Sequence, residues 1–326
     1  MATATLDRRQ ALKQFRVDYA NDWCPGCGDF GILGALQQAL AGMGRRPHEV
    51  VLVGGIGCSG KAQYYVNCYG VHTLHGRPLP FATGIKLANP ELTVIIVGGD
   101  GDGLGIGAGH FVNAGRRNVD LTYLLFNNEV YGLTQGQGAP TLQLGLQTKS
   151  LAEPNIQESV NGPSLAYASG FTWIGRGYSY DVRHLVRMIT RAVEHPGLSF
   201  LDIVQPCPTY NDLHDKAWFG GEGTENGESR IYDVETTDYD GRIPADADAA
   251  VYADRIAAFS QKALEWGDRI PIGLLLEREG VSDFGDRIGG RLDAYRAQPP
   301  AARAIAGADG RPTADITAVF DESGVP

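Results

Sequence analysis

The stretch Thr93–Gly101, TVIIVGGDG, carries the clearest structural signal in this chain. Its apolar, β-branched first part is typical of a buried strand, and Asp100 stands between two glycines directly after it. A second apolar run, Leu121–Phe126, predicts another strand, and the small apolar segment Leu104–Ala114 between them predicts a helix. The order strand, helix, strand indicates a right-handed crossover between two parallel strands.

A polar side chain follows each of these two predicted strands. Asp100 comes after the first strand, and the pair Asn127-Asn128 comes after the second. Because a crossover brings both strand ends to the same carboxyl edge of the sheet, we expect oxygen atoms of Asp100 and Asn128 to converge. Hard oxygen ligands beside a helix start suit a Mg²⁺ ion that holds a diphosphate. The competing interpretation is a glycine-rich turn and an asparagine pair in an ordinary α/β sheet.

Composition narrows the possible classes. The chain has 326 residues, which allows one large domain or one domain with an extension. A formal charge of −10 disfavours nucleic acid or an anionic membrane as the main partner. No apolar run approaches the roughly 20 residues that span a bilayer, and Met1–Arg16 lacks the apolar region of a secretory signal. We therefore expect a cytoplasmic protein that binds neither nucleic acid nor membrane.

Helical and strand patterns continue to alternate along the chain. The remaining expected elements are a helix at Gly31–Met43, a strand at Val50–Val53, a helix at Lys61–Tyr69, a helix at Ser164–Ser169, a strand at Thr172–Gly175, a helix at Val182–Val193 and a strand at Ser199–Val204. This alternation predicts an α/β fold with a mostly parallel sheet flanked by helices.

The composition changes beyond about Trp218. Glu222–Asp248 is acidic and rich in glycine, which indicates an extended arm or solvated loop. Tyr252–Trp266 has helical spacing, and Ala301–Pro326 is small and polar, as in a loosely held tail. We therefore expect one cofactor-binding domain at residues 1–217 and a partly irregular C-terminal extension at 218–326.

Gly55–Gly60, GIGCSG, follows a predicted strand and fits the G-x-G-x-x-G dinucleotide fingerprint. A dinucleotide site also needs an acidic residue about 20 positions further on, and no Asp or Glu lies between Val50 and Pro90. The fingerprint also contains Cys58, for which a nucleotide site has no use. A glycine-rich strand end whose amides approach a phosphate or a metal cluster explains the segment better.

Five cysteines are present, and the positions of four of them suggest a metal site. Cys24 and Cys27 have Cys-x-x-Cys spacing, which redox pairs share, although no strand is predicted before them. Cys58 and Cys207 each follow a predicted strand, so both thiols should lie on the edge that carries Asp100. Four such thiolates could hold a 4Fe-4S cluster or Zn²⁺, and spacing does not separate the two. Cys68 is expected to be a free thiol.

Taken together, these features resemble a known family, the β subunits of the 2-oxoacid:ferredoxin oxidoreductases, which include pyruvate and 2-oxoglutarate synthases. The Asp100 to Asn128 pattern itself resembles the diphosphate-binding motif of thiamine diphosphate (TPP) enzymes. The matching stretches are WCPGCG (Trp23–Gly28), GIGCSGK (Gly55–Lys61), HTLHGR (His72–Arg77), PFATGIKLANP (Pro80–Pro90), GDGDGLGIG (Gly99–Gly107), RRN (Arg116–Asn118), FNNEVYGLTQGQ (Phe126–Gln137) and QPCPTYN (Gln205–Asn211).

The resemblance implies a role for individual residues. It implies Mg²⁺ ligation by Asp100, Asn128 and the carbonyl of Val130. It implies one 4Fe-4S cluster, rather than zinc, on Cys24, Cys27, Cys58 and Cys207. The implied TPP contacts are Ile56, Gly57, Cys58, Ser59, His75, Gly76, Arg77, Pro78, Gly101, Asp102, Gly132 and Leu133. Family members often carry Lys or Gly at the position of Gln135, in a loop associated with substrate choice together with Leu133, so the 2-oxoacid stays open.

The implied activity is oxidative decarboxylation of a 2-oxoacid, pyruvate or 2-oxoglutarate, to acyl-CoA and CO₂. Electrons would pass through the cluster to ferredoxin, and coenzyme A would take the acyl group. The acidic residue that TPP chemistry needs on its aminopyrimidine ring comes from a second domain in this superfamily. We therefore expect an α-type partner chain, separate or fused, in a heterotetramer.

Two other classes remain possible from the residues alone. One is a non-redox TPP-dependent decarboxylase or synthase subunit with a structural zinc site. The other is a non-enzymatic α/β binding module with a thiolate metal site. Redox-active iron would exclude the first, and stabilisation by TPP with Mg²⁺ would argue against the second.

Overall fold

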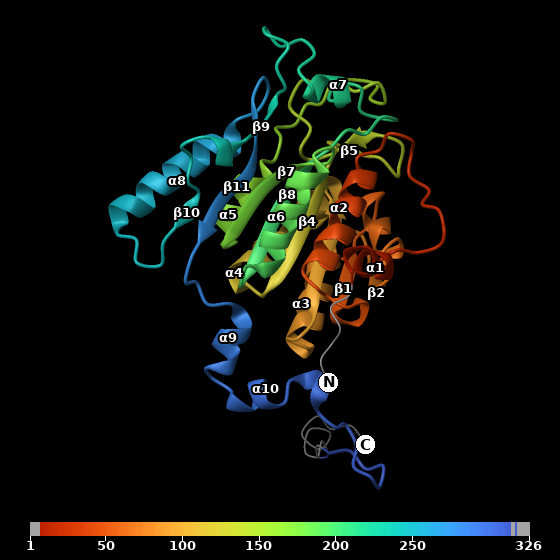
Figure 1. The fold of residues 1–326 in the computed structure, drawn as a ribbon, viewed down its shortest axis with the longest axis vertical. Coiled ribbons are helices and arrows are strands. Elements are labelled where there is room, and N and C mark those ends of the chain that lie inside the picture. The colour runs from red at the N-terminus through yellow and green to blue at the C-terminus, as the bar shows by residue number, and fades with distance from the viewer. Residues whose placement is uncertain (1–6, 314–316, 318–326) are drawn as a thin grey trace.

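A mostly parallel sheet runs through the part of the chain that this computed structural model describes, residues 7–313 and residue 317 (Figure 1). The strand order is β10-β11-β7-β8-β4-β3-β1-β2, with β9 paired to β11. Every neighbouring pair is parallel except β11 with β7. The strands are β1 (Val50–Gly54), β2 (Tyr69–His72), β3 (Thr93–Gly99), β4 (Leu121–Asn127), β7 (Trp173–Tyr178), β8 (Leu198–Val204), β9 (Ile231–Asp233), β10 (Arg242–Ile243) and β11 (Ile270–Arg278).

Helices cover both faces of this sheet, as the sequence predicted for an α/β fold. The helices are α1 (Arg8–Gln14), α2 (Asp29–Gly42), α3 (Pro78–Ala88), α4 (Ala108–Arg117), α5 (Gly162–Ser169), α6 (Val182–Glu194), α7 (Lys216–Phe219), α8 (Ala249–Leu264), α9 (Phe284–Gly289) and α10 (Asp293–Ala297). A short two-stranded ribbon, β5 (Val130–Tyr131) with β6 (Gln137–Gly138), lies outside the main sheet.

Two apolar cores form because successive residues of a strand point to opposite faces. Val50 and Leu52 belong to the core on the face covered by α1, α2 and α6, whereas Val51 and Val53 belong to the core on the face covered by α3, α4, α5 and α8. A strand with both faces buried reads as a continuous apolar run, which is the pattern of Thr93–Gly98.

The predicted crossover between β3 and β4 is present. The two strands are adjacent and parallel, with Gly99 opposite Phe126, so the residues that follow them meet at one edge. The helix between them begins later than expected, because Gly101–Ile106 forms a turn of π-type helix before α4. Such π-turns often mark functional sites.

The segment Lys61–Tyr69, expected to be helical, is divided. A 3₁₀ helix covers Ser59–Tyr64, and Tyr69 begins β2, which pairs in parallel with β1 at the end of the sheet. Its helical pattern is overridden by the pairing that this edge of the sheet offers.

The C-terminal part contributes to the same sheet. β11 pairs with β7, and β9 and β10 pair with β11. The boundary expected between residues 217 and 218 stays a prediction. α9 and α10 lie at the opposite end of the sheet from α7 and β5 (Figure 1). The expected tail Ala301–Pro326 falls partly outside the described residues. Among the residues that the structure describes, no helix is long and apolar enough to cross a membrane.

Candidate active site

Asp100 is a fully buried acidic group at the carboxyl edge formed by β3 and β4. The residue is 1% exposed. Oδ1 accepts the N–H of Gly101 at 3.0 Å, and Oδ2 accepts the N–H of Glu129 at 2.8 Å and the hydroxyl of Thr141 at 2.5 Å. Burial raises the pKa of Asp100 to about 7 despite these donors. A cation here would favour the ionised form that burial opposes.

Asn128 stands next to Asp100, at the end of the neighbouring strand. Its Oδ1 accepts the N–H of Val130 at 3.1 Å, so the chain turns tightly over three residues. The middle residue, Glu129, has a φ of 65°, which is a left-handed conformation that Gly adopts more readily. Asp100 holds this turn through the Glu129 N–H.

Asp102 is buried in the cavity wall and binds two loops together. Its Oδ1 accepts the N–H groups of Ile56 at 3.0 Å and Gly76 at 2.8 Å, and it lies 2.9 Å from Nδ1 of His75. A Cβ at Gly55 would lie 1.9 Å from Oδ2 of Asp102, so only glycine lets the strand end approach this carboxylate. The main role of Asp102 is therefore to hold the two loops of the wall together, and ligand binding by its oxygens is secondary.

These elements enclose a cavity of about 240 Å³. Its wall contains Asp100, Asn128 and Val130, the three predicted Mg²⁺ ligands, and most of the predicted TPP contacts. The predicted residues in the wall are Ile56, Gly57, Cys58, Ser59, His75, Asp100, Gly101, Asp102, Asn128, Val130, Gly132 and Leu133, and the wall also includes Gly99, Phe126, Tyr131 and Thr134. A larger hollow of about 550 Å³ lies between α3 and α10, away from all of these groups.

Four of the residues predicted to contact TPP or substrate lie outside the cavity wall. Gly76 and Pro78 are buried behind it, and Arg77 pairs with Nε2 of His110. Gln135 is exposed, with a φ of 80°, one residue beyond Thr134 at the rim. A direct contact of these four residues with a ligand in the cavity stays a prediction.

The three cysteine-bearing loops are joined by hydrogen bonds at the same edge. Nε1 of Trp23 donates to the carbonyl of Cys58 at 2.9 Å, and the N–H of Gly28 donates to the carbonyl of Pro206 at 3.4 Å. A Cβ at Gly132 would lie 3.4 Å from Sγ of Cys58 and 4.0 Å from Sγ of Cys207. Gly132 therefore lies beside both sulfurs.

The thiols lie close enough to influence one another electrostatically. Burial, followed by the charge of Asp29 and of neighbouring thiols, raises the pKa of Cys27 and brings that of Cys58 to about 12. Burial also raises the pKa of Cys207. Cys24 is exposed. No three His, Cys, Asp or Glu side chains among the described residues form a group that could hold a metal ion.

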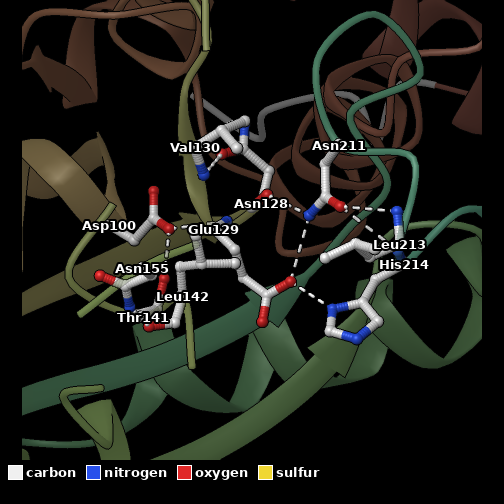
Figure 2. A network of polar contacts seen from close by, with 10 residues as sticks. All are labelled: Asp100, Asn128, Glu129, Val130, Thr141, Leu142, Asn155, Asn211, Leu213 and His214. Atoms are coloured by element: carbon white, nitrogen blue, oxygen red, sulfur yellow. Dashed lines mark hydrogen bonds and ion pairs between the residues drawn. The ribbon is translucent and has the colours of Figure 1, made fainter. Parts of the chain in front are cut away.

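Several residues of this site were not predicted from the sequence. Asp29 is fully buried, accepts from Nε2 of Gln205 at 2.8 Å, and has its pKa raised to about 6 by burial. Glu129, Asn211 and His214 form a buried network next to Asn128 (Figure 2). Asn211 ends the quoted QPCPTYN stretch, but no local pattern indicates which residues it contacts.

Two families match parts of the chain. Residues 55–203 match the family described as "Thiamine pyrophosphate enzyme, C-terminal TPP binding domain". Residues 207–291 match the family that describes the C-terminal part of the pyruvate ferredoxin oxidoreductase beta chain. The first match contains the whole cavity wall, and the second begins at Cys207 and contains Asn211.

Named relatives match most of the chain. A 2-oxoacid:ferredoxin oxidoreductase subunit beta of Saccharolobus solfataricus is 50% identical over 307 residues, 93% of this chain and 96% of the relative. A 2-oxoglutarate oxidoreductase subunit KorB of Mycobacterium tuberculosis is 40% identical over 230 residues, 71% and 61% of the two chains. A solved structure of 2-oxoglutarate:ferredoxin oxidoreductase from Magnetococcus marinus, with 2-oxoglutarate, coenzyme A and succinyl-CoA bound, has a TM-score of 0.77 at 28% identity, covering 96% of this chain and 95% of that one.

Proposed function

This chain belongs to the family of 2-oxoacid:ferredoxin oxidoreductase β subunits, and from that premise we propose the following details of its chemistry. It catalyses TPP-dependent oxidative decarboxylation of a 2-oxoacid to acyl-CoA and CO₂. Electrons leave through one 4Fe-4S cluster to ferredoxin. Mg²⁺ holds the diphosphate of TPP, and the chain works with an α-type partner in a heterotetramer, in the cytoplasm.

One observation carries this proposal: Asp100 and Asn128, at the ends of adjacent parallel strands, share a cavity with Cys58. The donors available there are a carboxylate, an amide oxygen and the Val130 carbonyl, which is the set that Mg²⁺ prefers. Burial raises the pKa of Asp100, and a cation beside it would stabilise the ionised form. The chemistry of the donor set therefore suits a diphosphate held through Mg²⁺.

The thiols suit an iron-sulfur cluster in the same way. Cys24, Cys27, Cys58 and Cys207 supply four sulfurs from three loops tied together by hydrogen bonds to the backbone. Gly132 lies beside the sulfurs of both Cys58 and Cys207, which places these two thiols near each other. Since burial keeps Cys27 and Cys58 protonated, cluster assembly would displace their protons. Cys58 borders both sites, which supports direct electron transfer between them.

Bound TPP would supply the electron sink for decarboxylation. The roles of this chain are binding and orientation. Asp100 and Asn128 hold the metal, and Asp102 orients His75 through Nδ1. Nε2 is then free to accept a hydrogen bond from the cofactor or substrate, and it can donate one to an anionic group when the ring is protonated. Leu133 and Phe126 give the cavity an apolar wall that limits water.

Exposed apolar side chains beside the cavity support the proposal of a partner chain. Leu74, Ile106 and Phe81 are 70%, 56% and 48% exposed, and they lie in or next to the His75 loop, the π-turn and α3. Apolar side chains gathered in this way mark protein interfaces. We propose that this surface docks the α-type chain that completes the active site.

The substrate that we propose is 2-oxoglutarate or pyruvate. The relatives from Mycobacterium tuberculosis and Magnetococcus marinus are named for 2-oxoglutarate. In this chain, however, the rim residue is Gln135, which can form a hydrogen bond with a distal carboxylate but cannot neutralise its charge. Both substrates should therefore be tested.

The test is a cofactor assay on the complex, purified without oxygen together with its partner chain. We expect about four irons per β chain, bound TPP, and an absorbance near 400 nm that dithionite bleaches. With 2-oxoacid and coenzyme A, the complex should reduce ferredoxin. Zinc in place of iron, with TPP bound, would support the non-redox TPP enzyme instead. Full turnover by the β chain alone would contradict the need for a partner.

A further inference from the structure

We propose that Asn211 is a positioning residue that links the loop of Cys207 to the turn of Asn128, so that the cluster and the diphosphate site influence each other (Figure 2). This inference rests on the proposed function. The family resemblance implies that the cluster and the diphosphate site are neighbours, and the link through Asn211 is a specific contact between them.

One end of the link is the turn that follows Cys207. The N–H groups of Tyr210 and Asn211 donate to the carbonyl of Cys207 at 3.3 and 3.0 Å. Oδ1 of Asn211 accepts the N–H groups of Leu213 and His214 at 3.1 and 3.3 Å. Asn211 is thus fixed to the backbone on both sides of its loop, and the residue is only 1% exposed.

The other end of the link is the turn that carries the predicted Mg²⁺ ligands. Nδ2 of Asn211 donates to the carbonyl of Asn128 at 3.0 Å and to Oε2 of Glu129 at 3.1 Å. Both acceptors lie within one residue of the Asn128 amide oxygen. A shift of the Cys207 loop would therefore pull directly on the residue that is proposed to bind the metal.

Glu129 extends the link as far as Asp100. Its N–H donates to Oδ2 of Asp100 at 2.8 Å, and its carboxylate also pairs with Nδ1 of His214. Figure 2 shows this continuous set of contacts, from His214 and Asn211 through Glu129 to Asp100. The unfavourable φ of Glu129 is held by these side-chain contacts, because a non-glycine residue adopts such a conformation only where its surroundings fix it.

His214 anchors the network to the C-terminal part of the chain. Its ring packs against the ring of Trp218, with centroids 4.0 Å apart, and it is 7% exposed. The Cys207 loop is therefore rigid at its far end as well. Because the far end of the loop is held, a displacement of the loop at Cys207 is expected to move Asn211 and, through it, the Asn128 turn.

Coupling between two binding sites is reciprocal. If the link works, TPP with Mg²⁺ should alter the environment of the cluster, and loss of the link should weaken TPP binding. Both effects can be measured without turnover. The readouts are the dissociation constant of TPP by calorimetry and the electron paramagnetic resonance spectrum of the reduced cluster, with and without TPP and Mg²⁺.

The experiment uses Asn211→Asp in the complex with its partner chain. Asp keeps the Oδ1 acceptor for Leu213 and His214 but removes the donor to Asn128 and Glu129. We expect the dissociation constant of TPP to rise about tenfold and the TPP-induced change in the cluster spectrum to disappear. Glu129→Gly is a second variant, which relieves the left-handed φ and should keep the fold while it removes the side-chain part of the same link.

The matched control is Asn118→Asp. Asn118 is 2% exposed and uses both amide atoms, accepting from Leu198 and Thr172 and donating to Ser282, but it lies at the opposite end of β4. It should lose stability like Asn211→Asp while its TPP affinity and cluster response stay as in the wild type. If Asn211→Asp and Glu129→Gly both bind TPP and respond as the wild type does, the proposed link is refuted but the proposed function is not. The same conclusion follows if TPP leaves the cluster spectrum of the wild-type protein unchanged. A wild type without iron or TPP would overturn the proposed function with it.

Discussion

Nδ1 of His75 lies 2.9 Å from Oδ1 of Asp102, a residue that is 2% exposed. An ionised carboxylate only accepts hydrogen bonds, so Nδ1 must donate and Nε2 is left for a ligand. The same oxygen accepts from Ile56 and Gly76, so one side chain fixes both loops of the cavity wall. Within the described residues, Oδ2 of Asp102 has no hydrogen-bond partner.

Asp102→Ala should therefore destabilise the protein strongly. Three donors would lose their acceptor, and we expect the free energy of unfolding to fall by about 3–5 kcal/mol, measured by urea denaturation. Asp102→Asn retains the Oδ1 acceptor and should cost less than half as much. An Ala variant as stable as the wild type would show that the loops do not depend on this carboxylate.

Asp100→Asn should abolish stabilisation by TPP and Mg²⁺. At about 100 times the dissociation constant, ligand binding adds about 2.7 kcal/mol to the stability of the wild type, which thermal unfolding detects. The variant lacks the carboxylate that we propose as a ligand of the metal. Asp120→Asn, at the amino end of β4, is the control and should respond as the wild type does. A full response in Asp100→Asn would remove Asp100 from the metal site.

Cys58→Ser should lose most of its iron and all electron transfer to ferredoxin, because a hydroxyl is a poor replacement for a thiolate ligand. Cys68→Ser provides the matched control. Cys68 is also partly buried, with its pKa raised to about 12 by burial, but it matches no predicted ligand. Iron analysis and a ferredoxin reduction assay distinguish the two. Equal iron content in both variants would refute the ligand assignment.

Gln135→Lys should shift substrate choice towards 2-oxoglutarate. A lysine at the rim can pair with the distal carboxylate, and we expect the ratio of kcat/KM for 2-oxoglutarate over pyruvate to rise about tenfold, or about 1.4 kcal/mol. Gln147→Lys adds the same charge at an exposed position further along the chain, in the connection between β6 and α5. A similar shift in both variants would indicate a general effect of charge.

Stability should fall at mildly acidic pH because of His184. The side chain is 2% exposed, its ring nitrogens have no hydrogen bond among the described residues, and burial lowers its pKa. Asp233, Asp181, Glu235 and Arg187 are the charged groups that act on it. The unfolded state therefore binds more protons, and stability is lost as pH falls from about 6.5 through the folded pKa.

His184→Leu should flatten this dependence. Urea denaturation at several pH values between about 7.5 and about 5 would measure the slope in the wild type and the variant. His48→Gln, at a histidine outside the core, should leave the slope unchanged. A wild-type slope in His184→Leu would assign the effect to other groups.

The sequence by itself determined the meeting of Asp100 and Asn128. Two apolar runs joined by a helical crossover form parallel strands, and the carboxyl ends of parallel strands share an edge of the sheet. The same rule placed Cys58 and Cys207 beside them, since both follow parallel strands. These conclusions needed only short-range patterns, which local residue types encode.

Only the tertiary structure decided which distant side chains brace this edge. Asn211 reaches Glu129 across 82 positions, and β11 joins the sheet antiparallel to β7. Helical periodicity at Lys61–Tyr69 was overridden when Tyr69 found a partner strand in β1. Such contacts depend on how whole elements pack against one another, and no local spacing of residues specifies them.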